Sequence, residues 1–155
     1  MSGLKVGDKA PDFRLETDSE GPVSRAGLKG KAYLVYFYPK DDTSGCTREA
    51  MDFTAAARKF TNLGVFVLGV SKDSVKSHEK FRAKHKLKVA LGSDPDLKMA
   101  QDWGVWGEKT LYGRKYMGME RATFLVDAKG VIAAAWRKVK VPGHVEAVLA
   151  AAKAL

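Results

Sequence analysis

The stretch that decides the fold runs from Lys31 to Phe60 and reads KAYLVYFYPKDDTSGCTREAMDFTAAARKF. Its first part, Lys31–Tyr38, is rich in aromatic and β-branched residues and is closed by a proline, which is typical of a buried central strand. The part from Ser44 to Phe60 is rich in Ala, Glu, Arg and Lys with apolar residues among them, and this predicts a helix. A buried strand followed directly by a helix is the first half of a β-α-β unit.

The next segments continue the alternation. Gly64–Val70 (GVFVLGV) predicts a second apolar strand, and Ser71–His85 predicts a polar helix that begins at one of its first Ser or Asp residues. Asp94-Pro95 marks the start of a short helix over Leu97–Trp103. Gly104–Glu120, rich in glycine and aromatic residues, is expected to be a loop.

The end of the chain has a different order of secondary-structure elements. Ala122–Val126 and Val131–Trp136 flank Asp127–Gly130 and predict a β-hairpin, and His144–Leu155 predicts an amphipathic helix. The early β-α-β units imply parallel strands, whereas the hairpin adds an antiparallel one. We therefore expect an α/β fold in which helices flank both faces of a central mixed sheet, formed by one domain over residues 1–155.

Composition excludes several classes of function. No apolar run approaches the roughly 18 to 20 residues that span a bilayer, and Met1–Asp12 lacks the apolar region of a signal peptide, so a cytoplasmic protein without membrane association is expected. The net charge is +9, but the 27 basic residues are spread along the chain among 18 acidic ones, and no nucleic-acid-binding motif is present, so no specific nucleic-acid binding is predicted. No cofactor motif or metal-ligand spacing is present, and we expect neither a cofactor nor a metal.

The cysteine content is the sharpest chemical feature. Cys46 is the single cysteine, which excludes an internal disulfide and a zinc site built from cysteines. It is expected in the first turn of the helix after the central strand, where unpaired N–H groups and the helix dipole favour an anion. That position favours the thiolate, the nucleophilic form of cysteine, although a nearby cation is also needed.

At this point the chain resembles a known family. The run Tyr36–Ala50, which contains Pro39-x-x-x-Thr43-x-x-Cys46, resembles the active-site segment of the peroxiredoxins and is closest to the bacterioferritin-comigratory-protein or PrxQ group. The resemblance extends from VGDKAPDF (6–13) through WGVWGEK (103–109) and RATFLVD (121–127) to Gly143-His144. It implies a thioredoxin-like fold and a thiol-dependent peroxidase.

The same resemblance implies roles for individual residues. Cys46 matches the peroxidatic cysteine, which attacks hydrogen peroxide or a small organic hydroperoxide and becomes a sulfenic acid. Thr43 matches the threonine that orients the thiolate and the peroxide, and Pro39 matches the proline that closes the pocket over the sulfur. Arg121 matches the arginine that stabilises the thiolate and the transition state. Glu49 lies where several peroxiredoxins keep an acid that orients this arginine.

Three positions depart from the group's pattern. Many members carry a second, resolving cysteine, but Met51 and Arg82 stand at its two usual places, and Ser44 replaces the proline of the common motif. A one-cysteine mechanism follows, in which an external thiol such as thioredoxin or a glutaredoxin–glutathione system resolves the sulfenic acid. Because the group is often monomeric, a monomer is expected.

Other functions were weighed against the peroxidase. A thioredoxin-type dithiol oxidoreductase is excluded because it needs Cys-x-x-Cys and Thr43 occupies the first position. A cysteine hydrolase would need His78, His85 or His144 as its base, but the first two are expected on a solvated helix and the third as a cap of the last helix. A non-enzymatic redox sensor on the same fold remains the alternative, because a sulfenic acid without a resolving cysteine persists.

The segment from Trp103 to Met119 left two interpretations open. Its tryptophans, tyrosines and methionines fit either a ligand-binding rim or core packing and subunit contact, and packing is favoured.

Overall fold

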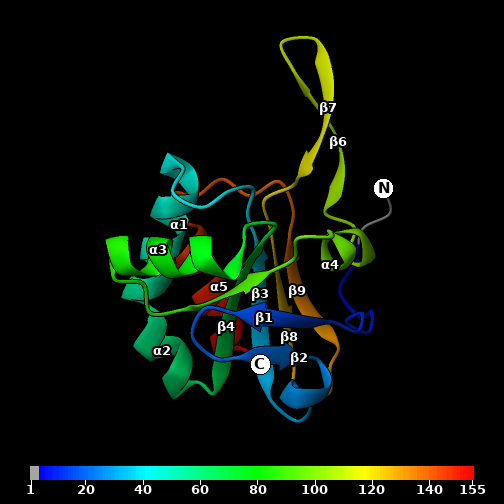
Figure 1. Ribbon diagram of the computed structural model, residues 1–155. Coiled ribbons are helices and arrows are strands. Elements are labelled where there is room, and N and C mark those ends of the chain that lie inside the picture. Colours follow the sequence, from blue (N-terminus) through cyan, green and yellow to red (C-terminus); the bar gives the residue numbers. More distant parts are fainter. Residues whose placement is uncertain (1–3) are drawn as a thin grey trace.

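A seven-stranded mixed sheet forms the centre of the computed structural model, which describes residues 4–155 (Figure 1). The strand order is β2-β1-β5-β4-β3-β8-β9. The strands are β1 (Arg14–Thr17), β2 (Pro22–Ser24), β3 (Ala32–Phe37), β4 (Val65–Ser71), β5 (Ala90–Ser93), β8 (Ala122–Val126) and β9 (Ile132–Trp136). Strands β3, β4 and β5 run parallel to one another, whereas the other pairings are antiparallel. The predicted mixed sheet is confirmed.

Helices cover both faces of this sheet. They are α1 (Ser44–Ala55), α2 (Ala57–Asn62), α3 (Val75–His85), α4 (Lys98–Asp102) and α5 (His144–Lys153), with a short 3-10 turn, η1 (Ala26–Leu28). Side chains of α1, α2, α3 and α5 share one buried cluster, and α4 contributes to the cluster on the opposite face. No helix within residues 4–155 is long and apolar enough to cross a membrane.

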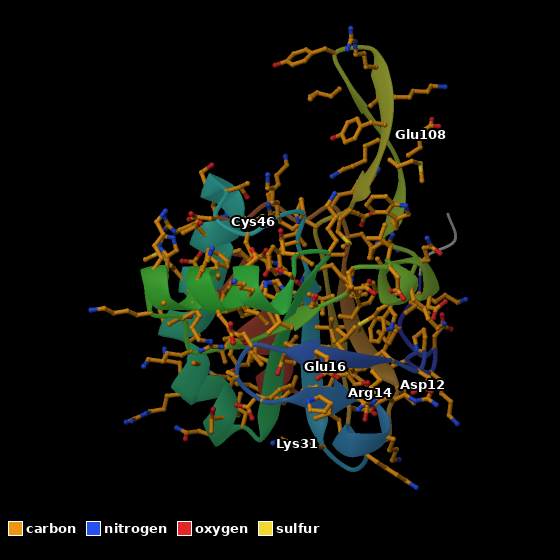
Figure 2. All side chains as sticks on the ribbon, viewed as in Figure 1. Asp12, Arg14, Glu16, Lys31, Cys46 and Glu108 are labelled. Atoms are coloured by element: carbon orange, nitrogen blue, oxygen red, sulfur yellow. The ribbon has the colours of Figure 1, made fainter. Side chains whose placement is uncertain are left out.

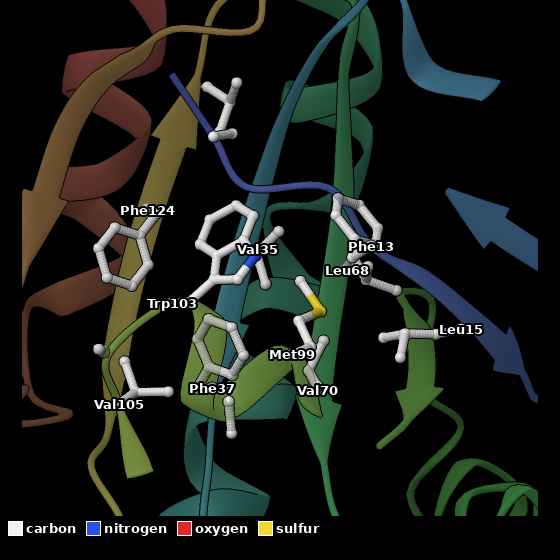
Figure 3. Close-up of a cluster of buried hydrophobic side chains, with 14 of the residues drawn as sticks. Phe13, Leu15, Val35, Phe37, Leu68, Val70, Met99, Trp103, Val105 and Phe124 are labelled. Carbon is white, nitrogen blue, oxygen red and sulfur yellow. The ribbon is translucent and has the colours of Figure 1, made fainter. Parts of the chain in front are cut away.

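The alternation of side chains along β3 builds both clusters. Tyr33, Val35 and Phe37 point to the face where Phe13 and Trp103 pack (Figure 3). Leu34, Tyr36 and Tyr38 point to the other face and join the cluster that contains Cys46. Because successive residues of a strand face opposite sides, a continuous apolar run is what a central strand with two covered faces requires.

Most predicted elements are present, with shifted ends. The helix expected over Ser44–Phe60 is divided into α1 and α2 at Ala56, and α3 begins after Ser74, whose hydroxyl oxygen accepts a hydrogen bond from the Ser77 N–H at 3.1 Å. Strands β1, β2 and β5 were not predicted. They are three or four residues long, and their pairing with neighbouring strands, not a local pattern, maintains them.

The prediction of a loop over Gly104–Glu120 is wrong. This segment forms an antiparallel hairpin of β6 (Trp106–Leu111) and β7 (Arg114–Met119) that projects from the body of the protein (Figure 1). The turn residues Tyr112 and Gly113 have φ values of 51° and 76°, the positive angles that a tight two-residue hairpin turn requires. The sequence did not indicate this hairpin, because a tyrosine stands at the first turn position, where Asn, Asp or Gly is usual.

The packing interpretation of the aromatic residues and methionines in Trp103–Met119 holds for one part of the segment only. Trp103 and Met119, at its base, are buried in the core as the packing interpretation predicts. Tyr112 at the tip is 97% exposed, and Tyr116 and Met117 are also exposed. Packing therefore accounts for the base of the segment and not for the projecting part.

A glycine of β4 determines how α1 rests on the sheet. Gly69 is paired with Tyr36, and a Cβ at Gly69 would lie 2.6 Å from Cζ of that ring. The other face of the Tyr36 ring stacks on Phe53 of α1, with ring centres 4.5 Å apart. Any side chain at position 69 would therefore push Tyr36 against α1.

We predict that Gly69→Ala lowers the free energy of unfolding by about 1 to 3 kcal/mol, because the buried ring has no room to move. The matched control is Gly92→Ala in β5, whose Cβ would meet the flexible end of Leu15 at 2.8 Å and should cost less. Denaturant unfolding of both variants checks this. Equal losses in the two would contradict the role assigned to Tyr36.

Candidate active site around Cys46

Cys46 is the third residue of α1, which starts where β3 ends. Thr43 has an extended backbone and forms the N-cap, so the first-turn N–H groups beyond it lack helical acceptors. The Cys46 side chain is 1% exposed and unoxidised. Figure 2 places it at the end of the molecule from which the hairpin rises.

The cation beside the sulfur is Arg121, the arginine that the family resemblance indicated. It immediately precedes β8, whose first residue, Ala122, is paired with Phe37 at the end of β3. This register brings the arginine to the point where the chain enters α1. Its Nη2 donates to the Cys46 sulfur at 3.3 Å, and its Nη1 donates to Oε1 of Glu49 at 2.7 Å.

Glu49 lies one helical turn after Cys46 and its side chain is fully buried. Burial raises the pKa of Glu49 from 4.5 to about 7, and the charge and hydrogen bond of Arg121 offset part of this effect. Its second oxygen, Oε2, has no hydrogen-bond partner in the described part of the chain. For Arg121, burial opposes the charge, but Glu49 and Cys46 outweigh it and raise the pKa of the guanidinium.

The sequence analysis did not single out Gly45, which makes this arrangement possible. A Cβ at that position would lie 3.2 Å from Nη2 of Arg121. The missing side chain therefore lets the guanidinium lie close to the helix start and reach the sulfur. The glycine directly before the cysteine was the feature of the sequence that could have indicated this close approach.

The two remaining predicted site residues lie in the loop before α1. The Thr43 side chain is exposed, and its hydroxyl donates to the carbonyl oxygen of Lys40 at 3.0 Å. Pro39 is half-buried directly after the buried Tyr38. The structure thus joins Cys46 to Arg121 by a direct contact, and it places Thr43 and Pro39 nearby in the chain without a hydrogen bond to the sulfur among residues 4–155.

The three histidines do not form a hydrolase site. His78 was expected on a solvated helix, but it is fully buried and lies 2.7 Å from Asp41. His144 lies in the first turn of α5, with Gly143 at the N-cap, and its Nε2 is 2.7 Å from the Thr123 hydroxyl, so the predicted cap role is wrong. Burial, and then the charge of Arg121, lowers the pKa of His144 to about 4.

The third histidine, His85, is bonded to Asp42 at the surface, and no hydrogen bond among the described residues joins any histidine to Cys46. In the same part of the chain, no group of three or more His, Cys, Asp or Glu side chains is suited to hold a metal ion.

Comparison with known proteins identifies the family of the chain. The family model of the AhpC/TSA family matches residues 6–135. A putative peroxiredoxin Bcp from Coxiella burnetii is 50% identical over 146 residues, which cover 94% of this chain and 97% of that protein.

Two solved structures have nearly the same fold. A variant of PrxQ from Xylella fastidiosa superposes with a TM-score of 0.92 at 37% identity, covering 99% of this chain and 98% of the other. The bacterioferritin comigratory protein of Xanthomonas campestris, studied for its alkyl peroxide reduction activity, superposes with a TM-score of 0.88 at 42% identity, covering 97% and 96%. With the family model and these relatives matching almost the whole chain, the protein belongs to the AhpC/TSA family and, within it, to the Bcp or PrxQ peroxiredoxins.

Proposed function

We propose that Cys46 is the nucleophile of this thiol-dependent peroxidase and that the Arg121 guanidinium is its electrostatic partner. The observation that carries the proposal is the 3.3 Å contact between Nη2 of Arg121 and the buried sulfur at the start of α1. A cation and a helix N-terminus directed at one sulfur favour the thiolate, which is the form that attacks a peroxide.

In the first step the thiolate attacks the terminal oxygen of the peroxide R–O–O–H, where R is hydrogen or an alkyl group. An S–O bond forms and the O–O bond breaks, and the electron pair leaves with the RO group, which takes a proton and becomes water or an alcohol. The sulfur is oxidised by two electrons to the sulfenic acid and the peroxide is reduced by two. The alkyl peroxide activity of the Xanthomonas campestris relative supports small organic hydroperoxides as substrates beside hydrogen peroxide.

The surrounding groups are assigned to the same step. Arg121 and the N–H of Cys46 would stabilise the charge that develops as the O–O bond breaks. The Thr43 hydroxyl uses its proton on the Lys40 carbonyl, so it is left to accept the proton of the incoming peroxide. Pro39, half-buried beside the loop, would keep water from the sulfur.

The second step needs a thiol from outside the chain, because the sequence contains one cysteine. The external thiol R′–SH condenses with the sulfenic acid and gives a mixed disulfide and water, and a second thiol then releases Cys46 as a thiol. Thioredoxin or a glutaredoxin–glutathione system is the proposed reductant, and a cytoplasmic monomer is the proposed form. Because the sulfenic acid persists until a thiol arrives, a redox sensor is the competing outcome.

Replacement of the nucleophile is expected to abolish turnover. With dithiothreitol as reductant, Cys46→Ser should show no peroxide consumption above the uncatalysed rate, whereas the wild-type protein consumes peroxide continuously. The measurement is peroxide loss together with the intact mass of each protein. Formation of the sulfenic acid in the wild-type protein without turnover would favour the sensor instead.

Arg121→Lys is expected to slow the oxidation of Cys46 by about 10²- to 10³-fold. Lysine keeps the charge but lacks the planar fork that lets one side chain hold the sulfur and Glu49 together. Stopped-flow measurement of thiol loss gives the rate. Arg137→Lys is the control, since its fork binds Glu120 near the hairpin base, and it should keep the wild-type rate.

Glu49→Gln is expected to remove a pH dependence of stability. Because burial raises the folded-state pKa of Glu49 above 4.5, its contribution to stability is full below pH 4.5 and is lost as the pH rises through about 7. Between pH 4.5 and pH 7 the free energy of unfolding of the wild-type protein should fall by about 3 kcal/mol relative to that of the variant. Denaturant unfolding of both proteins at pH 5 and pH 8 tests this, and parallel profiles would contradict it.

A further inference from the structure

The chain between β3 and α1 is held by contacts on the side away from Arg121. Asp41 lies five residues before Cys46, and its side chain is buried although the loop is at the surface. Its backbone N–H donates to Oδ2 of Asp73 at 2.8 Å, and the Ser71 hydroxyl donates to the same carboxylate oxygen at 2.7 Å. The loop is thus attached to the segment that follows β4.

The Asp41 side chain is hydrogen-bonded to three other side chains. The Tyr38 hydroxyl donates to Oδ1 at 2.6 Å, and the Ser77 hydroxyl donates to Oδ2 at 2.8 Å. Nδ1 of His78 lies 2.7 Å from Oδ2. Burial, followed by the effect of Tyr36 and Asp41, raises the pKa of Tyr38 well above its usual value, so this hydroxyl keeps its proton and donates it. Two hydroxyl groups and one imidazole thus hold this buried side chain in place.

His78 is completely buried, and both of its ring nitrogens face oxygen atoms that accept. Nε2 lies 2.9 Å from the carbonyl oxygen of Gly92, which has no proton to give, so Nε2 carries a hydrogen. Nδ1 makes the second hydrogen bond of the ring, with Oδ2 of Asp41 at 2.7 Å. The Tyr38 hydroxyl, 3.4 Å from Nδ1, is already used by Asp41 at the shorter distance. Both ring nitrogens of this buried histidine are therefore hydrogen-bonded, one to Asp41 and one to the Gly92 carbonyl.

The next residue of the loop is attached to the same helix. Asp42 has φ 61°, an unfavourable backbone conformation for a residue other than glycine. Its two carboxylate oxygens pair with Nζ of Lys84 at 2.7 Å and Nε2 of His85 at 2.9 Å, near the end of α3. Two consecutive loop residues are therefore bound to α3, and the chain enters α1 directly after them.

Helix α3 is itself anchored on its other side. Arg82 pairs with the buried Asp18 in the turn after β1, and it also donates to the carbonyl oxygens of Leu87 and Val89. The helix is thus a fixed support against which the loop is held. No side chain of α3 contacts the Cys46 sulfur by a hydrogen bond among residues 4–155, so any effect on catalysis must pass through the loop.

We propose that His78 and Asp41 are positioning residues for the peroxidatic cysteine: the buried hydrogen bond between them clamps the Asp41–Thr43 loop to α3 and thereby aligns the start of α1 with Arg121. The proposal rests on Cys46 as the nucleophile. Reaction with peroxide requires the sulfur, the Cys46 N–H and the guanidinium to be aligned, whereas alkylation of the thiolate by iodoacetamide requires mainly access. The clamp should therefore affect the first reaction much more than the second.

The test compares both rate constants in Asp41→Ala, His78→Gln and Asp41→Asn. We expect the first two to slow oxidation by hydrogen peroxide at least about 10-fold and to change the iodoacetamide rate less than about 3-fold. Asp41→Asn should stay within about 3-fold of the wild type, because its oxygen still accepts from Tyr38 and its amide donates to a neutral His78. Asp18→Asn breaks the ion pair on the far side of α3 and is the control, expected to lose thermal stability but not oxidation rate.

Wild-type rates in Asp41→Ala and His78→Gln, with only a lower melting temperature, would overturn the proposal. So would an equal slowing in Asp41→Asn and Asp41→Ala. If Asp41→Ala and His78→Gln do not fold, nitrogen NMR of His78 in the wild type and in Asp41→Asn decides: a change in the Nδ1 signal on substitution is expected, and an unchanged signal would overturn the clamp. Failure of the proposed function would differ from all of these, since Cys46 of the wild-type protein would then not react with peroxide.

Discussion

The Arg121 guanidinium holds a sulfur atom and a carboxylate at the same time, and the rest of the site depends on this fork. Glu49 is fully buried and Cys46 almost so, and two acidic groups in such a place are costly unless a cation lies between them. One planar side chain supplies parallel donors to both, at 2.7 Å and 3.3 Å. The fork thus brings the buried sulfur, the buried carboxylate and one cation together at the start of α1.

The fork forms only because distant parts of the chain meet at the end of β3. The antiparallel pairing of β8 with β3 delivers an arginine 75 positions away from the cysteine. The Tyr36 ring, between Gly69 and Phe53, sets the height of α1 above the sheet, and Gly45 leaves room for the guanidinium. Small changes in packing at these glycines would move the sulfur relative to its cation.

The helix start is constrained from the opposite side by α3. Arg82 of this helix pairs with the buried Asp18 side chain and so fixes α3 to the turn after β1. The β6–β7 hairpin projects from the same end of the molecule (Figures 1 and 2), and its Tyr112, Tyr116 and Met117 are exposed.

Local sequence determined the features that depend on neighbours in the chain. The apolar run before Pro39 produces β3, the residues after Thr43 produce α1, and together they place the single cysteine at a helix start. The resemblance of the segment 121–127 to the peroxiredoxins pointed to Arg121, and the roles of Cys46, Arg121, Thr43 and Pro39 remain predictions. Only the tertiary structure decided the features that depend on distant partners. Strands β1 and β5 are too short to have a pattern of their own, and the hairpin was hidden by a tyrosine in its turn. His78 looks solvated in a polar helix, but its partner, Asp41, comes from a loop 37 positions earlier, and burial of such a pair is favourable only when both members are present.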